Sequence, residues 1–457
     1  MVVKRFQAYD PEQPYLLPAA PREWLPEDHL ALFVHDVVAH LDLRDIYADY
    51  NHEAGGRPPL EPRMMVSVWI YAYAVGLRSS RKVQNALVQD VAFRFLSGNQ
   101  QPRYWALNQF RTRHREALSR LFVQSVRLAQ KAGLVKLGHV AIDGSKLQAN
   151  ASTSKAMSYA RMELEEQRLL REVQAYFDAC DAVDAAEDET YGDGDGNEVP
   201  PHLRRRKDRL KAIEQAKKEL EQEAIARAEK EKAARREKAE AEGREFKARK
   251  DPKDTKPDAQ AQRNFTDSES RIMLRGKTVV QGYNTQIAVD SEHQVIVATD
   301  LTNQAADAPH LPGLMNQTHA NTGTYPSEVS ADAGYYSEEN LDAIEETGAT
   351  PLVAPGRITH NEWRDQKAPR GRIPNNLTRR QRMKRLLSTK AGKARYVLRQ
   401  VTAEPVYGQI KHARGMRQVL HRGLAKVRAL WRFDAAVHNL LKIFRAGIDP
   451  AILPNTP

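Results

Sequence analysis

The chain has 457 residues, with 70 Lys and Arg against 59 Asp and Glu, and a formal net charge of +11 at pH 7. This length predicts two or three domains, and the positive charge favours a polyanionic partner such as nucleic acid. The single cysteine, Cys180, excludes an intrachain disulfide and a thiolate metal site. No secretory signal and no long apolar run is visible, so we expect a cytoplasmic protein without membrane contact.

Residues 1–135 are expected to form a helical DNA-binding domain. The apolar residues of 30–41 recur at helical spacing, and the run MMVSVWIYAYAVGL at 64–77 predicts a buried helix. The later segments 79–98 and 106–133 predict further helices joined by Gly- and Pro-marked turns, which suits a helix-turn-helix reader of DNA. Three basic residues are the candidate DNA contacts: Arg111, Arg113 and Arg115. The alternative is an ordinary helical domain with a solvated basic face.

The rest of the chain predicts a mixed α/β core that a helical insertion interrupts. Residues 136–154 hold a first strand, and the charged segment 155–262 predicts two long solvated helices in an antiparallel pair. Residues 263–457 complete the core. They predict an antiparallel strand pair at 277–290 and 293–303, strands at 327–336 and 350–355, and helices at 308–319 and 337–348, the last capped by Ser337. Basic helices finish the chain.

Three acidic residues are candidate site residues, and two of them stand apart from other acids. Glu404 is the only Asp or Glu between Asp365 and Asp434, a stretch with nineteen Lys and Arg, and Asp143 is the only one between Glu116 and Glu163. Asp143 and Asp332 each end an apolar strand just before a glycine, which predicts a carboxylate beside space for a ligand. Asp300 ends another strand and competes with Asp332.

Pro405 predicts that Glu404 lies in the first turn of its helix, because proline is tolerated there. Gly408, Lys411 and Gly415 would then share its face, and two glycines on one stripe suggest close approach of another backbone.

Three carboxylates from two strands and a helix suit Mg²⁺, which takes oxygen ligands and bridges to phosphate. Two such ions can drive in-line phosphoryl displacement. In their basic surroundings we expect the carboxylates to stay ionised near neutrality. Taken singly, each acid is more simply explained as a structural residue.

At these residues the sequence resembles the DDE transposases of bacterial insertion sequences. The blocks that carry the resemblance are VAIDGSKLQAN, VSADAGYYSEEN and YVLRQVTAEPVYGQIKHARGMRQVLHRGLAKV. The family's Y-R-E-K signature falls on Tyr396, Arg399, Glu404 and Lys411. Four residues separate Arg399 from Glu404, where the broad pattern has three.

The resemblance implies an α/β fold with an RNase H-like mixed sheet flanked by helices, an N-terminal all-α DNA-binding domain and a long charged helical insertion. The charged insertion is not part of the family's minimal core, and its role stays open. The resemblance further implies a nucleoid-associated bacterial enzyme that binds terminal inverted repeats, cleaves DNA with Mg²⁺ (or Mn²⁺ as a substitute) and joins the ends to target DNA, as a homodimer in the synaptic complex. The implied catalytic and metal-binding residues are Asp143, Asp332 and Glu404. The implied DNA contacts of the C-terminal part are Tyr396, Arg399, Lys411 and Arg414.

Two other functions remain open at this point. One is a metal-dependent nuclease on the same fold, which cuts without joining. The other is a catalytically silent DNA-binding regulator derived from a transposase.

Overall fold

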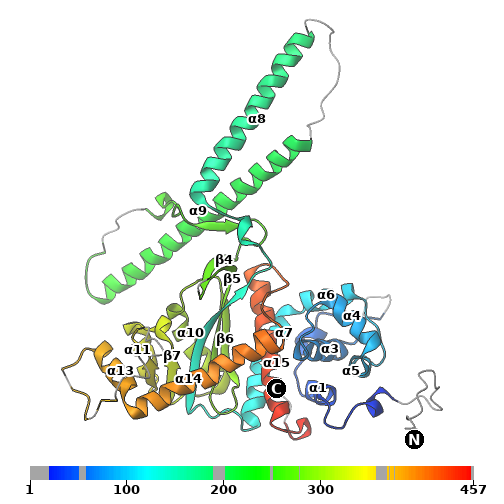
Figure 1. Cartoon of the computed structure of the whole chain (residues 1–457), viewed down its shortest axis with the longest axis vertical. Helices are drawn as coiled ribbons and strands as arrows, with labels where there is room; N and C mark the ends of the chain where they lie inside the picture. The colour runs from blue at the N-terminus through cyan, green and yellow to red at the C-terminus, as the bar shows by residue number, and fades with distance from the viewer. Residues whose placement is uncertain are drawn as a thin grey trace, which may run out of the picture.

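The computed structural model describes residues 20–50, 58–188, 201–246, 251–276, 278–356, 368–369, 371–374 and 376–453. Within these ranges a mixed sheet forms the centre of the molecule, helices cover it, and a long helical pair projects from it (Figure 1). None of the described helices is long and apolar enough to span a membrane.

Six described strands form the main sheet, in the order β4-β5-β1-β7-β8 with β6 also paired to β5. Strands β1, β7 and β8 are parallel, whereas β4, β5 and β6 pair antiparallel, so the predicted mixed α/β core is confirmed. Their bounds are β1 His139–Gln148, β4 Arg271–Arg275, β5 Thr278–Asp290, β6 Ile296–Thr302, β7 Glu328–Ala331 and β8 Thr350–Val353. Strand β4, a short edge strand with an arginine at each end, was not predicted.

The N-terminal part is helical, as predicted, but two expected helices are each divided. Asp90 ends one helix and caps the next, since its Oδ1 accepts hydrogen bonds from the amides of Ala92 and Phe93. The second division is at His114. The helices are α1 Leu30–Ala39, α2 Arg44–Tyr47, α3 Pro62–Ala74, α4 Ser80–Gln89, α5 Val91–Leu96, α6 Tyr104–Arg113 and α7 Arg115–Lys131, after the short η1 Pro21–Trp24.

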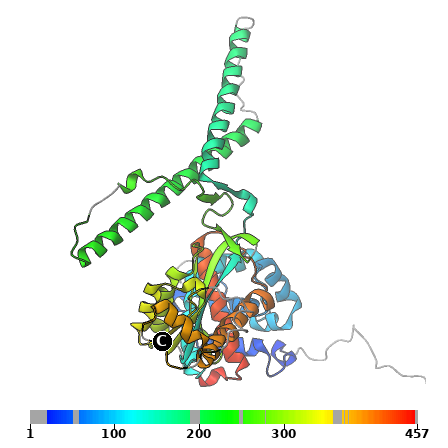
Figure 2. The same cartoon turned by 60° about the vertical axis from the view of Figure 1, so that its left-hand side comes forward.

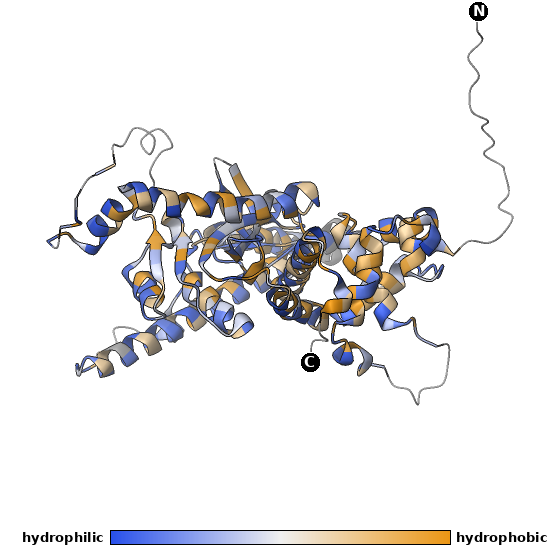
Figure 3. Cartoon of the chain, turned by 90° about the horizontal axis from the view of Figure 1, so that it is seen from below, coloured by the Kyte–Doolittle hydropathy of each residue, from blue (hydrophilic) through white to orange (hydrophobic). Residues whose placement is uncertain are grey.

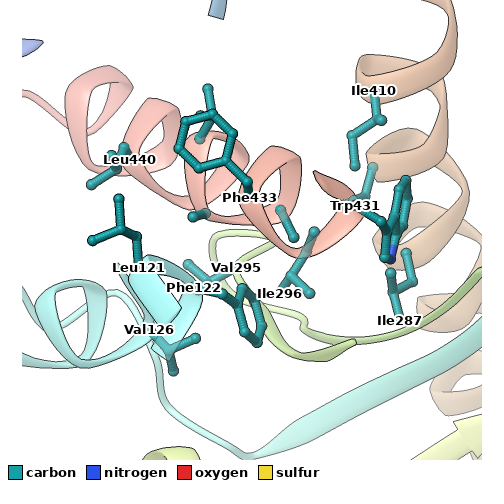
Figure 4. Close-up of a cluster of buried hydrophobic side chains, with 14 of the residues drawn as sticks. Leu121, Phe122, Val126, Ile287, Val295, Ile296, Ile410, Trp431, Phe433 and Leu440 are labelled. Atoms are coloured by element: carbon teal, nitrogen blue, oxygen red, sulfur yellow. The ribbon is translucent and has the colours of Figure 1, made fainter. Parts of the chain in front are cut away.

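Helix α15, Leu424–Arg445, joins the N-terminal helices to the sheet. It packs against α7 on one side and against β6 on the other, with Phe433 and Leu440 among its buried residues (Figure 4). Trp431 is fully buried, and its indole N–H donates to Thr299 Oγ1 over 2.7 Å. One apolar core therefore continues from the N-terminal helices through α15 to the sheet. In Figure 3 hydrophobic residues gather where these helices pack together.

The insertion is an antiparallel helical pair, as predicted. Helices α8 Tyr159–Asp188 and α9 Pro201–Ala241 project from the sheet on a small base of two strands, β2 Ala156–Ser158 and β3 Gln262–Asn264 (Figure 2). Arg209 pairs with Glu165 over 2.9 Å, and Lys217 pairs with Glu166. A separate small apolar core lies between the helices, formed by Met157, Tyr159, Met162, Leu169, Leu210, Ile213, Ala216 and Leu220. The insertion therefore supports itself without extending the main core.

The remaining elements follow the predicted order. Helix α10 Leu311–Thr322 follows η4 Ala308–His310, and α11 Glu338–Glu345 begins after Ser337, whose Oγ accepts from the amide of Asn340 over 3.1 Å. The predicted cap is thus confirmed. The chain continues with η5 Ala333–Tyr335 before α11, then α13 Arg379–Ser388, α14 Lys390–Gly408, the π-helix η6 Gln409–Ala413 and, after α15, η7 Pro450–Ile452.

Candidate active site

Asp143 and Asp332 lie side by side at the centre of the sheet. Ile142 of β1 pairs with Ala331 of β7 in parallel register, so the two aspartates are the next residues on adjacent strands. Asp332 is the last residue before η5, and its Oδ1 accepts from the amide of Gly334 over 2.8 Å. The sheet itself therefore brings these two acids together across almost two hundred residues of chain.

Helix α14 carries Glu404, and the prediction that Glu404 lies in a first turn is wrong. Pro405 lies near the C-terminal end of a helix that begins at Lys390. Proline cannot donate to the carbonyl four residues earlier, and that carbonyl, Val401 O, instead accepts from Gln294 Nε2 over 2.9 Å. The side chain of Gln294 replaces the lost helical hydrogen bond, so the proline is accommodated.

Two tyrosine hydroxyls fix α14 against the sheet. Tyr407 donates toward the carbonyl oxygens of Thr285 at 2.9 Å and Asp143 at 3.2 Å, and Tyr396 donates to Ala331 O at 3.3 Å. Both aspartates therefore have a neighbouring backbone carbonyl held by α14. Tyr407 was missed in the sequence, although it follows Glu404 by less than one helical turn.

Arg399 lies between two of the acids. Its Nη1 is 3.7 Å from Asp143 Oδ1, and its Nη2 is 3.7 Å from Glu404 Oε1. The extra residue in the Y-R-E-K spacing does not remove the guanidinium from the acids. Glu404 is 56% exposed at the rim, whereas the Asp143 side chain is only 14% exposed.

The expectation that all three acids stay ionised is wrong for Asp143. Burial raises its pKa to about 7, and the charges of Asp332 and Glu404 add to the rise, while Arg399 and the Gly144 amide oppose it. A second positive charge beside Asp143 would favour its ionised carboxylate.

The three carboxylates have the donor chemistry that Mg²⁺ prefers, because all their ligand atoms are hard oxygens. Among the described residues, however, no group of three or more His, Cys, Asp or Glu side chains is arranged to hold a metal ion. Asp143 and Glu404 instead flank Arg399, which supplies a counter-charge. The three carboxylates fit a divalent cation by their chemistry. The Glu404 side chain would have to turn inward to bind the same cation as Asp143 and Asp332.

Lys411 lies in the π-helix and supports the strand beyond Asp143. Its Nζ donates to Ser145 Oγ over 2.5 Å and to Lys146 O over 2.9 Å, and burial lowers its pKa to about 8.

The prediction that Gly408 and Gly415 share one helix face with Glu404 is wrong, because Gly415 lies beyond the helical turns at a φ of +72°. An added Cβ at Gly408 or Gly415 would meet no atom within 4 Å, so neither glycine serves a close approach.

Two expected DNA contacts are buried structural residues. Arg111 is 3% exposed, donates to Arg78 O over 2.7 Å and lies 4.2 Å above the Trp69 ring. Arg414 is 6% exposed and pairs with the fully buried Asp434 over 2.9 Å. Since a buried charge is retained only when it is paired or hydrogen-bonded, these arginines serve the core and cannot reach DNA.

Arg113 and Arg115 do line an open groove on the N-terminal helices, with a volume of about 730 Å³. Trp105 is 57% exposed in this groove, and the Arg81 guanidinium lies 4.2 Å above the Tyr104 ring. We name this surface the α4–α6 groove; it is lined by Ser80, Arg81, Tyr104, Trp105, Asn108, Gln109, Thr112, Arg113 and Arg115. Exposed aromatic rings among arginines suit the stacking and charge of nucleic acid.

Asp300 does not compete with Asp332. It lies on β6, separated from β1 by β5, and pairs with Arg428 at 3.2 Å and Arg432 at 3.4 Å. It is an ordinary partner of α15.

Two protein-family models match the chain. The transposase DDE domain matches residues 254–440, and the transposase domain DUF772 matches residues 20–113. The chain belongs to the DDE transposases of the insertion-sequence type. Its sheet is accordingly of the RNase H-like fold. No curated protein and no solved structure shows significant similarity to the chain.

The DDE match contains Asp332 and Glu404 but begins at residue 254, near the end of the insertion, so Asp143 lies outside it. The pairing of β1 with β5 and β7 brings Asp143 back into the matched domain of this transposase. Enzymes of this family generally use a divalent metal.

Gly144, the residue after Asp143, has no room for a side chain. An added Cβ would lie 2.7 Å from both Asp307 Oδ1 and Gln286 Nε2 and 3.0 Å from Tyr335 Oη. We expect Gly144→Ala to destabilise the fold by about 1–3 kcal/mol through overpacking, and to reduce DNA cleavage. Thermal unfolding and a nicking assay measure the two effects.

Gly408→Ala is the matched control, because this helical glycine has no atom within 4 Å of an added Cβ. It should leave stability unchanged or raise it by up to about 1 kcal/mol. Equal losses in the two variants would contradict the crowding at Gly144.

Proposed function

We propose that this transposase cleaves DNA at the ends of its insertion sequence and transfers the freed strand to target DNA, with Asp143, Asp332 and Glu404 as the acids that hold two Mg²⁺ ions. The observation that carries the proposal is that Asp332 lies beside Asp143 through the β1–β7 register, while Arg399 lies 3.7 Å from both Asp143 and Glu404. Bound ions would activate a water or a 3′-hydroxyl and stabilise the leaving oxygen.

The basic residues around the acids have distinct proposed roles. Arg399 is placed to contact a phosphate when a cation takes over its role as counter-charge to Asp143 and Glu404. Lys411 holds Ser145 and the backbone of Lys146, so it fixes the strand after Asp143 and offers a second positive charge to the DNA backbone. Tyr396 would help to position α14 and Arg399. Its hydroxyl donates to Ala331 O, and the centre of its ring lies 5.8 Å from the guanidinium carbon of Arg399.

The α4–α6 groove is the proposed contact of the N-terminal helices with the terminal inverted repeats. Arg113 and Arg115 would contribute charge, while Trp105 and Tyr104 would contribute apolar and stacking surface. Recognition of two ends in one synaptic complex suggests a homodimer.

The roles of the three acids are tested by Asp143→Asn, Asp332→Asn and Glu404→Gln. Each should reduce Mg²⁺-dependent nicking and strand transfer by more than the ten- to hundredfold that loss of a supporting residue typically costs. Binding to labelled inverted-repeat DNA in a gel shift should persist. Asp300→Asn is the control acid and should keep activity. Full nicking in any of the three variants would refute that residue's assignment, and nicking without strand-transfer products in the unaltered protein would favour a nuclease.

The groove is tested by Trp105→Ala. Loss of one aromatic stacking surface typically costs about 1–3 kcal/mol, so binding to inverted-repeat DNA should weaken about tenfold or more in a gel shift. Val88→Ala removes a comparably exposed apolar residue of α4 outside the groove and should leave binding unchanged. Equal affinities for the two variants would exclude Trp105 from the DNA contact.

A further inference from the structure

Asp307, in the loop between β6 and η4, lies against Gly144, the residue after Asp143, and near Gly334 in the turn after Asp332. We propose that Asp307 is a positioning residue of the active site, whose fixed negative charge beside Asp332 strengthens the binding of the divalent cation. The inference rests on the proposed function of Asp143, Asp332 and Glu404.

One oxygen of Asp307 is held by three donors. Its Oδ1 accepts from Asn284 Nδ2 at 2.7 Å, Gln286 Nε2 at 2.8 Å and Lys146 Nζ at 3.1 Å. Asn284 and Gln286 are fully buried on β5. Three donors on one oxygen fix the position of the Asp307 carboxylate.

Glycine allows Asp307 to come this close to β1. Gly144 pairs with Gln286 and Lys146 pairs with Asn284, so these four residues share one face of the sheet, while Asp143 faces the other. An added Cβ at Gly144 would lie 2.7 Å from Asp307 Oδ1. The glycine after Asp143 was expected to leave space for a ligand, but that space is filled by Asp307 and its hydrogen-bond donors.

The other oxygen of Asp307 is near the second catalytic acid. An added Cβ at Gly334 would lie 3.0 Å from Asp332 Oδ1 and 3.4 Å from Asp307 Oδ2. Oxygens of Asp332 and Asp307 therefore both lie near Gly334, in the turn that follows Asp332. Asp307 therefore lies near Gly144 through its Oδ1 and near Gly334 through its Oδ2.

A buried hydrogen-bond chain links Asp307 to the turn after Asp332. The Tyr335 hydroxyl donates to Gln286 Oε1, which directs the Gln286 amide nitrogen to Asp307. Burial raises the pKa of Tyr335 well above its ordinary value, and the charges of Tyr407, Asp307, Asp143 and Asp332 add to the rise. One hydroxyl thus lies within the field of all three aspartates.

The Lys146–Asp307 ion pair allows a test in which a charge role and a structural role predict opposite signs. Asp307→Asn removes negative charge near the cation-binding acids and should weaken Mn²⁺ binding at least tenfold. Lys146→Met removes the neutralising ammonium and should tighten Mn²⁺ binding or leave it unchanged. A purely structural brace predicts that both variants weaken binding. Isothermal titration of the full-length protein with Mn²⁺ alone, at constant ionic strength, measures each affinity.

Two reference variants separate the inference from the proposed function. Asp143→Asn should abolish Mn²⁺ binding, and Asp300→Asn should not change it. If Asp143→Asn loses binding while Asp307→Asn stays within twofold of the unaltered protein, the role of Asp307 is refuted and the proposed site survives. If Lys146→Met weakens Mn²⁺ binding as much as Asp307→Asn does, the charge role of Asp307 is also refuted. If the unaltered protein binds no Mn²⁺, or binds it independently of Asp143, both proposals fail.

Discussion

The acids of the active site repel one another, and the guanidinium of Arg399 counters that repulsion. Like charges a few ångströms apart in a partly buried site cost several kcal/mol unless a positive charge or a proton compensates them. Arg399 compensates Asp143 and Glu404 at 3.7 Å from each. Burial first, and the charges of Asp332 and Glu404 after it, still raise the pKa of Asp143 to about 7, so Arg399 does not fully offset them. A site with unneutralised negative charge is suited to bind a divalent cation.

The order of the strands in the sheet brings these acids close together. β1 is central and lies between β5 and β7, so Asp143 has Asp332 beside it and α14 across one face. The opposite face carries Asp307 with Gln286 and Asn284. The long insertion leaves after β1 and returns before β4, and the β2–β3 pair closes its base. The catalytic strands therefore keep their register although about a hundred residues separate β1 from the strands that follow.

Strand and helix positions in the core could be predicted because their apolar patterns and caps are local, as at Ser337 and the β5–β6 pair. Isolation from other acids identified Asp143 and Glu404, and its place at the end of an apolar strand identified Asp332, so all three were visible without any structure. Local rules failed where a distant side chain changes the outcome. Pro405 lies late in α14 because Gln294 satisfies the carbonyl of Val401, and Arg111 and Arg414 are buried by Trp69 and Asp434. Asp307 carried no sequence signal, because its importance depends on glycines brought near it by the sheet.

The most direct measurement is the anomalous scattering of Mn²⁺ in crystals of the transposase bound to inverted-repeat DNA. The account predicts Mn²⁺ within coordination distance, about 2.0–2.6 Å, of carboxylate oxygens from both Asp143 and Asp332, with Glu404 turned inward and Arg399 on a DNA phosphate. Manganese bound away from these acids, with Arg399 still between Asp143 and Glu404 at the cleavage site, would contradict it.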